Sequence, residues 1–207
     1  MTTVFFIRHG PTEENIIKRI QGQTPGTLII PETERYVSAI VPLLRAKSPQ
    51  LLLSSDLDRA VRTRAILKEF LQIPNIKDGV SPLLREKAMG FYEGMLWGEV
   101  PAEFREELGK SNYNFRKFGG ENEEDVRQRV KEALRQISQR YPDTRIVCIT
   151  HSGWLRQLVK LADTAGILPD TWTNRTAIYE GGLGPIGQLL YFHPIDIEAI
   201  YQTEEEE

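Results

Sequence analysis

Short apolar runs alternate with amphipathic stretches along the chain. Residues 4–7, 51–53 and 146–149 form unbroken apolar runs, which are typical of strands buried on both faces. A further run at 189–192 follows a glycine-rich stretch at 181–187 and predicts a late strand. Between the runs, apolar residues recur at helical spacing over 36–44, 57–70 and 126–137.

The third helical stretch also carries a start signal. Asn122 is a suitable N-cap, and Asp125 follows three residues later. Strands that alternate with helices predict an α/β fold, a three-layer α/β/α sandwich around a mostly parallel central sheet. In such sheets, ligands bind outside the carboxyl ends of the strands, so chemistry is expected at that edge.

Length and charge narrow the picture further. The 207 residues suit a single domain spanning 1–207, with an acidic tail at 203–207 that we expect to fray. The net charge of -3 gives no global basic field, so we expect neither nucleic acid nor a membrane as a partner. The single cysteine, Cys148, lies in an apolar run, and no stretch resembles a signal peptide or a membrane span. We therefore expect a cytoplasmic protein.

Two histidines fall where the sheet rule places chemistry. His9 follows the run at 4–7, His151 follows the run at 146–149, and a glycine stands close behind each. Glycine allows a sharp turn and a close approach of a ligand to main-chain N–H groups. A helix that begins near Gly153 would also point its N-terminus at the site, which favours an anion.

Two arginines and a carboxylate complete a possible phosphoryl site. Arg8 and Arg59 each offer a bidentate fork for phosphate oxygens, and with His151 they could neutralise a phosphoryl dianion. His9 could then attack phosphorus through an unprotonated ring nitrogen. Glu86 is the candidate proton donor to the leaving oxygen, because a nearby phosphate dianion favours the protonated carboxyl group.

Five sequence blocks carry these residues in a fixed order. They contain Arg8, His9, Gly10, Thr12, Asn15, Gln21 and Gly22; Ser54, Ser55, Asp56, Leu57, Arg59, Ala60 and Thr63; Leu84, Glu86, Gly90, Glu93 and Gly94; Gly120, Glu121, Asp125, Val126 and Arg129; and Thr150, His151 and Gly153. In this order the blocks resemble the histidine phosphatase superfamily, and specifically its phosphoglycerate mutase-like branch.

The resemblance assigns roles to the five candidate catalytic residues. It implies that His9 becomes a phosphohistidine, while Arg8, Arg59 and His151 bind the transferred phosphoryl group. Glu86 would protonate the leaving oxygen and then activate the hydrolytic water. No metal or other cofactor is implied, and a bisphosphoglycerate primer would be needed only by a mutase.

Further residues are candidates for contact with the phosphate or the substrate. They are Thr12, Asn15, Gln21, Gly22, Ser152, Arg116 and Lys117. Asn15 would contact the phosphate or brace its pocket. Arg116 and Lys117 stand where relatives often place basic residues that contact the substrate, although a solvated pair of surface charges is an equal alternative.

The chain also departs from the pattern of the family. Pro11 replaces the usual Glu or Gln, and the stretch 23–31 scarcely matches the segment that lines the site mouth in relatives. The expected cap insertion at 95–119 is shorter than in the mutases, which leaves the site open to water. We therefore expect a phosphatase acting on a small phosphorylated metabolite.

Three alternatives share parts of this evidence. A phosphoglycerate mutase-type phosphotransferase would use the same catalytic residues with a different acceptor. A non-catalytic protein could bind a phosphorylated ligand on the same fold. A metal hydrolase could use His9, His151 and Glu86, but it would need a further ligand, and the neighbouring arginines favour an anion.

Overall fold

The central sheet is mostly parallel, as the sequence predicts. The computed structural model describes residues 2–166, 190–192 and 197. Its strands are β1 (Thr3–Arg8), β2 (Leu51–Ser54), β3 (Lys77–Val80), β4 (Arg145–Thr150) and β5 (Leu190–Phe192), in the order β3-β2-β4-β1-β5. All neighbouring pairs are parallel except β1 with β5. The predicted late strand is thus confirmed as β5, whereas the stretch at 181–187 and the acidic tail lie outside the described residues.

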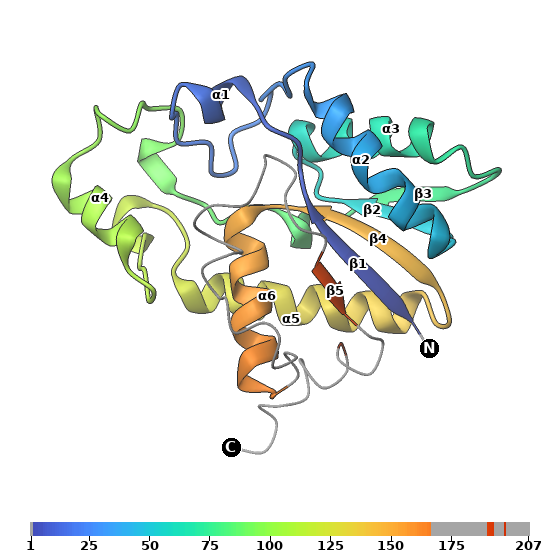
Figure 1. Ribbon diagram of the computed structural model, residues 1–207. Coiled ribbons are helices and arrows are strands. Elements are labelled where there is room, and N and C mark those ends of the chain that lie inside the picture. The colour runs from blue at the N-terminus through green and yellow to red at the C-terminus, as the bar shows by residue number, and fades with distance from the viewer. Residues whose placement is uncertain (1, 167–189, 193–196, 198–207) are drawn as a thin grey trace.

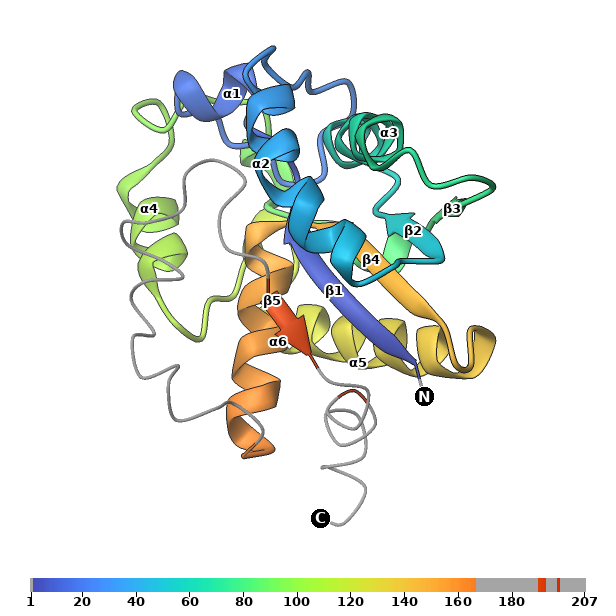
Figure 2. The ribbon, with the colours of Figure 1, turned by 45° about the vertical axis from the view of Figure 1, so that its right-hand side comes forward.

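Helices cover both faces of the sheet (Figures 1 and 2). The longer ones are α2 (Thr33–Ala46), α3 (Asp58–Leu71), α5 (Glu123–Arg140) and α6 (Ser152–Thr164), and the shorter ones are α1 (Glu13–Ile16) and α4 (Ala102–Gly109). Single 3-10 turns lie at η1 (Pro82–Leu84), η2 (Gly90–Tyr92) and η3 (Arg116–Phe118). None of the described helices combines the length and the apolar character that a membrane crossing requires.

Alternation along the strands explains the three layers. Phe5 and Ile7 of β1 pack into the hydrophobic cluster formed with α2 and α3, whereas Val4 and Phe6 pack into the cluster formed with α5 and α6. Successive side chains of a strand point to opposite faces, so a strand covered on both faces reads as an unbroken apolar run. The predicted three-layer sandwich is confirmed.

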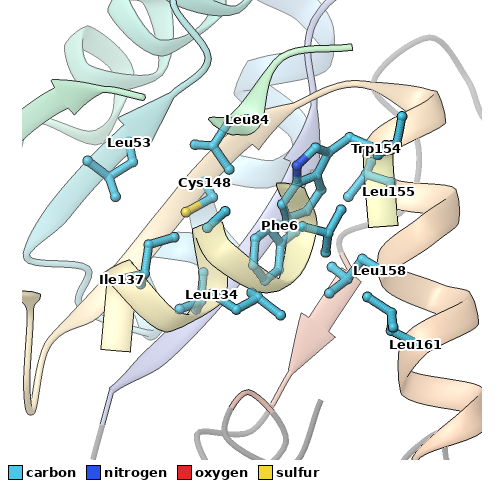
Figure 3. Close-up of a cluster of buried hydrophobic side chains, with 14 of the residues drawn as sticks. Phe6, Leu53, Leu84, Leu134, Ile137, Cys148, Trp154, Leu155, Leu158 and Leu161 are labelled. Atoms are coloured by element: carbon cyan, nitrogen blue, oxygen red, sulfur yellow. The ribbon is translucent and has the colours of Figure 1, made fainter. Parts of the chain in front are cut away.

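Trp154 anchors α6 to the sheet (Figure 3). Its side chain is fully buried, its ring lies 5.4 Å from that of Phe6, and its indole N–H donates to the Leu83 carbonyl at 2.8 Å. Leu84, in the same turn, is also fully buried in this cluster. Trp154 therefore fixes the start of α6 and the segment that leads to Glu86.

The segment 95–119, which the sequence marks as a cap, folds around a cluster of aromatic rings. Phe104, Phe115 and Phe118 pack with Tyr92, with ring centroids 4.7–5.4 Å apart in the closest pairs. α4 begins at Ala102 and buries Phe104 in this cluster. In Figure 1 this segment and α1 lie beyond the end of the sheet toward which β1 runs.

Two local features differ from the sequence-based expectation. β3 was not predicted, because its residues Lys-Asp-Gly-Val are mostly exposed at the sheet edge and show no apolar run. α3 was predicted correctly from its apolar spacing, but its buried face also includes the polar Thr63 beside Leu67. Thr63 is turned inward because its hydroxyl bonds to the turn after β1.

We predict that Trp154→Ala lowers the free energy of unfolding by about 3–5 kcal/mol, because it removes a fully buried indole. Trp154→Phe should cost less, since it keeps most of the packing and loses the hydrogen bond to Leu83. Phe91→Ala, at a side chain that is 78% exposed, is the control and should change stability by less than about 0.5 kcal/mol. Urea unfolding measures all three. A Trp154→Ala protein as stable as the control would contradict this account of the core.

Candidate active site

The carboxyl ends of β1, β2 and β4 bring His9, Ser55 and His151 to one edge of the sheet. The backbone N–H of His9 donates to Thr150 at 2.9 Å, and that of Ser55 donates to Ile149 at 3.0 Å, so the three chain turns are in register. The imidazole rings of His9 and His151 lie 4.9 Å apart, centroid to centroid. The structure therefore brings together two histidines that are 142 positions apart in the sequence (151 − 9).

The ring of His9 is held in one orientation. Its Nδ1 lies 2.6 Å from the Gly10 carbonyl oxygen, which can only accept, so Nδ1 carries the proton and Nε2 keeps a free electron pair. Burial, and then the charges of Arg59 and Arg8, hold the pKa of His9 well below its usual value. A neutral imidazole with a free Nε2 is the form that a nucleophilic histidine needs.

In His151 the other ring nitrogen, Nε2, makes the hydrogen bond. Its Nε2 lies 2.6 Å from the Ser55 hydroxyl, which also accepts the backbone N–H of Leu57 at 3.2 Å. If the hydroxyl hydrogen goes to Nε2, the ring proton is on Nδ1, and this buried atom has no hydrogen-bond partner among the described residues. Burial and the Arg59 charge lower the pKa of His151 as well. The neutral ring can thus donate from Nδ1 to a bound anion.

Arg59 is almost fully buried and is oriented by the loop after Gln21. Its two terminal nitrogens donate to the Gly22 carbonyl at 2.7 Å and to the Thr27 hydroxyl at 3.1 Å. Its Nε is buried without a partner in the described part of the chain. The stretch 23–31, which departs from the family pattern, therefore supports the second arginine of the site.

Arg8 adds a second cation at the end of β1. Its Nε is also buried without a partner among the described residues. Burial lowers the pKa of Arg8, while Glu86 opposes this effect, and an arginine remains charged near neutral pH. Two guanidinium groups beside one carboxylate leave net positive charge in a buried place, which favours an anionic ligand.

Glu86 is fixed by two backbone N–H groups. Oε1 accepts from Lys87 at 2.9 Å, and Oε2 accepts from Gly153 in the first turn of α6 at 3.1 Å. A Cβ atom at Gly153 would lie 2.2 Å from Oε1, so a larger residue here would displace the Glu86 carboxylate from this position. Arg129, paired with Glu121 at 2.8 Å, also donates to the Glu86 carbonyl at 3.2 Å. Two backbone N–H groups thus hold the carboxylate of Glu86, and Arg129 holds its main chain.

Lys87, next in the chain, connects this loop to the segment 95–119. Its amine is buried over the ring of Tyr113, 4.0 Å from the centroid. Burial lowers the pKa of Lys87 to about 8. This contact joins the loop of Glu86 to the segment that borders the site.

A cleft of about 390 Å³ opens at this edge. It is lined by Arg8, His9, Asn15, Lys18, Arg19, Ile20, Gln21, Gly22, Arg59, Glu86, Met89, Trp97 and Leu108. His151 is not among these lining residues, but its ring lies 4.9 Å from that of His9 and its Nδ1 has no partner among the described residues. The five residues proposed as catalytic are therefore assembled in one place.

The other candidate residues are placed differently from one another. Asn15, Gln21 and Gly22 line the cleft, whereas Thr12 is fully buried, does not line it, and caps α1 in a reciprocal pair with Asn15. Ser152 is half-buried as the first residue of α6.

Arg116 and Lys117 do not reach the cleft. The Arg116 Nε lies 3.0 Å from Asp125, and the Lys117 amine lies 2.6 Å from Glu103. Both side chains are exposed and ion-paired. Their placement is that of solvated surface charges.

Sequence reasoning missed several residues that organise the site. Ser55 and Thr63 belong to the matched blocks but were assigned no role, and hydroxyl groups beside a strand end were the available signal. The Thr63 hydroxyl donates to the Arg59 carbonyl at 2.6 Å and accepts from Gly10 at 2.9 Å, so it joins α3 to the His9 turn. Lys18 and Trp97 gave no signal, because their place in the cleft depends on the pairing of distant loops.

The described residues contain no cluster of three or more His, Cys, Asp or Glu side chains placed to hold a metal ion. A model of the histidine phosphatase superfamily (branch 1) matches residues 4–176. The chain belongs to the histidine phosphatase superfamily. This membership makes it an enzyme of the phosphomonoesterase type.

Individual relatives agree with this assignment. A metal-independent phosphoserine phosphatase of Arabidopsis thaliana is 28% identical over 181 residues, covering 84% of this chain and 75% of the relative. A probable phosphoglycerate mutase, GpmB, of Cronobacter sakazakii is 30% identical over 162 residues, covering 77% and 74%.

Solved structures share the fold. Bacillus stearothermophilus YhfR has a TM-score of 0.73 at 21% identity and covers 97% of this chain and 100% of its own. A mycobacterial glucosyl-3-phosphoglycerate phosphatase in complex with VO3 has a TM-score of 0.65 at 25% identity, covering 78% and 82%.

The lowered pKa values of His9 and His151 predict how stability depends on pH. The unfolded chain takes up protons near pH 6.5, but the folded chain does so only at lower pH. The contribution of these two histidines to the free energy of unfolding is therefore fully present above about pH 6.5. It is lost as the pH falls from there toward the pKa values of the folded protein. Unfolding in urea between about pH 8 and about pH 5.5 measures this slope. The double variant His9→Asn, His151→Asn should show a shallower slope, and an equal or steeper one would contradict the prediction.

Proposed function

We propose that the chain is a metal-independent phosphatase that hydrolyses a small phosphorylated metabolite through a phosphohistidine on His9. One observation carries the proposal: the neutral His9 ring, with Nδ1 committed to Gly10, lines the same cleft as the half-buried Arg8 and the buried Arg59. That arrangement supplies a nucleophile and the charge that a phosphoryl dianion requires. The name of the Arabidopsis relative supports the absence of a metal from the reaction.

In the first step, the substrate phosphoryl group binds between Arg8, Arg59 and the Nδ1–H of His151. The Nε2 of His9 attacks phosphorus, and the bond from phosphorus to the ester oxygen breaks. Glu86 gives its proton to the leaving oxygen, so the product leaves as an alcohol. The hydrogen bond from Nδ1 to Gly10 stabilises the positive charge that develops on the ring.

In the second step, the ionised Glu86 accepts a proton from water. The water oxygen attacks phosphorus, the bond to His9 breaks, and phosphate is released. Glu86 thereby regains its proton for the next cycle. Its two backbone N–H contacts keep it in place for both steps.

Water is the proposed acceptor because the cleft is open. Asn15 and Lys18 line it and are exposed, and the segment 95–119 that borders it is short. The mutase-named relative keeps phosphoryl transfer to a second substrate as the alternative. An assay with 3-phosphoglycerate and a bisphosphoglycerate primer distinguishes the two, because a mutase isomerises the substrate faster than it releases phosphate.

We predict that His9→Ala lowers kcat for an aryl phosphate by about 10⁴-fold or more, because it removes the nucleophile. Lys77→Gln, on the exposed edge strand β3, is the control and should keep wild-type activity. Wild-type turnover should also survive EDTA. Unchanged turnover in His9→Ala would refute the nucleophile, and loss of activity with EDTA would favour the metal hydrolase.

Glu86→Gln should lower kcat for an alkyl phosphate by about 10²–10⁴-fold, because the poor leaving group needs its proton. An aryl phosphate should lose less in the first step, since a phenolate leaves more readily. Hydrolysis of the phosphoenzyme then becomes slow, so rapid mixing should show a burst of phenol equal to the enzyme concentration. Equal losses for the two substrates, with no burst, would contradict the assignment of Glu86.

A further inference from the structure

The cleft is larger than a phosphoryl group needs, and its outer part has a distinct chemistry. At about 390 Å³ it is within the range of pockets that hold complete small molecules. The inner part contains the proposed catalytic residues. The lining also includes four apolar residues, Ile20, Met89, Trp97 and Leu108, and we refer to these together with Lys18 as the outer part of the cleft.

Backbone pairing builds this outer part from two distant loops. The N–H of Trp97 donates to the Lys18 carbonyl at 2.9 Å, and the N–H of Ile20 donates to Met95 at 2.9 Å. Arg19 and Leu96 form an antiparallel bridge between these bonds. Lys18 and Trp97 are therefore neighbours across the pairing, and both line the cleft.

Trp97 is the most exposed of these four apolar residues. Its side chain is 38% exposed, although indole is usually well buried. An exposed aromatic ring on a cleft wall offers a stacking surface to a planar group. A flat apolar leaving group would cover this ring.

Lys18 gives the outer part a positive charge. It adopts a left-handed backbone conformation, with φ at 56°, which non-glycine residues seldom adopt without support from their surroundings. Its amine forms no ion pair with a described residue, while the neighbouring Arg19 donates to the Gly94 carbonyl. Among the described residues that line the cleft, Glu86 is the only carboxylate. Lys18 is thus free to meet an anionic group.

We propose that the outer cleft selects phosphomonoesters whose leaving group combines a flat apolar body, packed on Trp97, with an anionic group that meets Lys18. The inference rests on the proposed phosphatase function and names its substrate class.

Equilibrium binding tests this selection without interference from the chemical step. The His9→Ala variant, which cannot form the phosphoenzyme, is titrated by calorimetry with glycerol 1-phosphate, phenyl phosphate and 4-carboxyphenyl phosphate. Inorganic phosphate is titrated first to establish that the inner site is intact. We expect affinity to rise in the order in which the three esters are named.

Two further substitutions in the His9→Ala background separate the contributions of Trp97 and Lys18 to the binding of the esters. Trp97→Ala should weaken both aryl phosphates about threefold to tenfold and leave glycerol 1-phosphate unchanged. Lys18→Gln should abolish the advantage of the carboxylated ester over phenyl phosphate, an advantage of about twofold to fivefold. Phe91→Ala and Lys77→Gln are the matched controls and should change none of the three constants.

The outcomes distinguish this inference from the proposed function. Equal dissociation constants for the three esters, or dissociation constants that do not change in Trp97→Ala and Lys18→Gln, would overturn the selection by the outer cleft. If the wild-type protein still hydrolyses all three esters and His9→Ala does not, the proposed phosphatase function holds even though the inference about the outer cleft is wrong. The KM values of the wild-type enzyme should follow the same order as the dissociation constants.

Discussion

The site depends on the guanidinium groups of the half-buried Arg8 and the buried Arg59, which lie beside two neutral histidines at one edge of the sheet. Burial lowers the pKa values of His9 and His151, and the charges of Arg59 and Arg8 lower them further. Three buried nitrogens of this cluster, Nε of Arg8, Nε of Arg59 and Nδ1 of His151, have no hydrogen-bond partner among the described residues. Buried donors and uncompensated charge are costly, and a phosphoryl dianion offsets both. One electrostatic arrangement therefore explains the neutral nucleophile and the preference for an anion.

The rest of the fold holds this charge cluster in place. Parallel pairing of β1 with β4 and of β4 with β2 sets His9, His151 and Ser55 side by side. Thr63 connects the His9 turn to Arg59, and the loop after Gln21 supplies further acceptors for the guanidinium group. The absence of a side chain at Gly153 lets Glu86 approach the start of α6. These contacts come from four separate parts of the chain, which is why the site needs the complete sandwich.

The sequence predicted the layers well, because strands covered on both faces leave unbroken apolar runs. It also predicted the start of α5, where Asn122 and Asp125 form the expected reciprocal cap. β3 was missed because an exposed edge strand has no such run. The gathering of His9, Arg59, Glu86 and His151 followed from their order at strand ends and from the family resemblance. The positions of Arg116 and of Trp97 could not be predicted, because each depends on which loops pair in three dimensions.

The central claim is that His9 carries the phosphoryl group, and chemical trapping tests it most directly. Enzyme mixed with an aryl phosphate is denatured in alkali, which preserves phosphohistidine, and the modified residue is located by mass spectrometry. The account predicts one phosphoryl group on the peptide that contains His9, in larger amount in Glu86→Gln than in the wild-type enzyme. A phosphoryl group on another residue, or turnover without any phosphoenzyme in either protein, would contradict it.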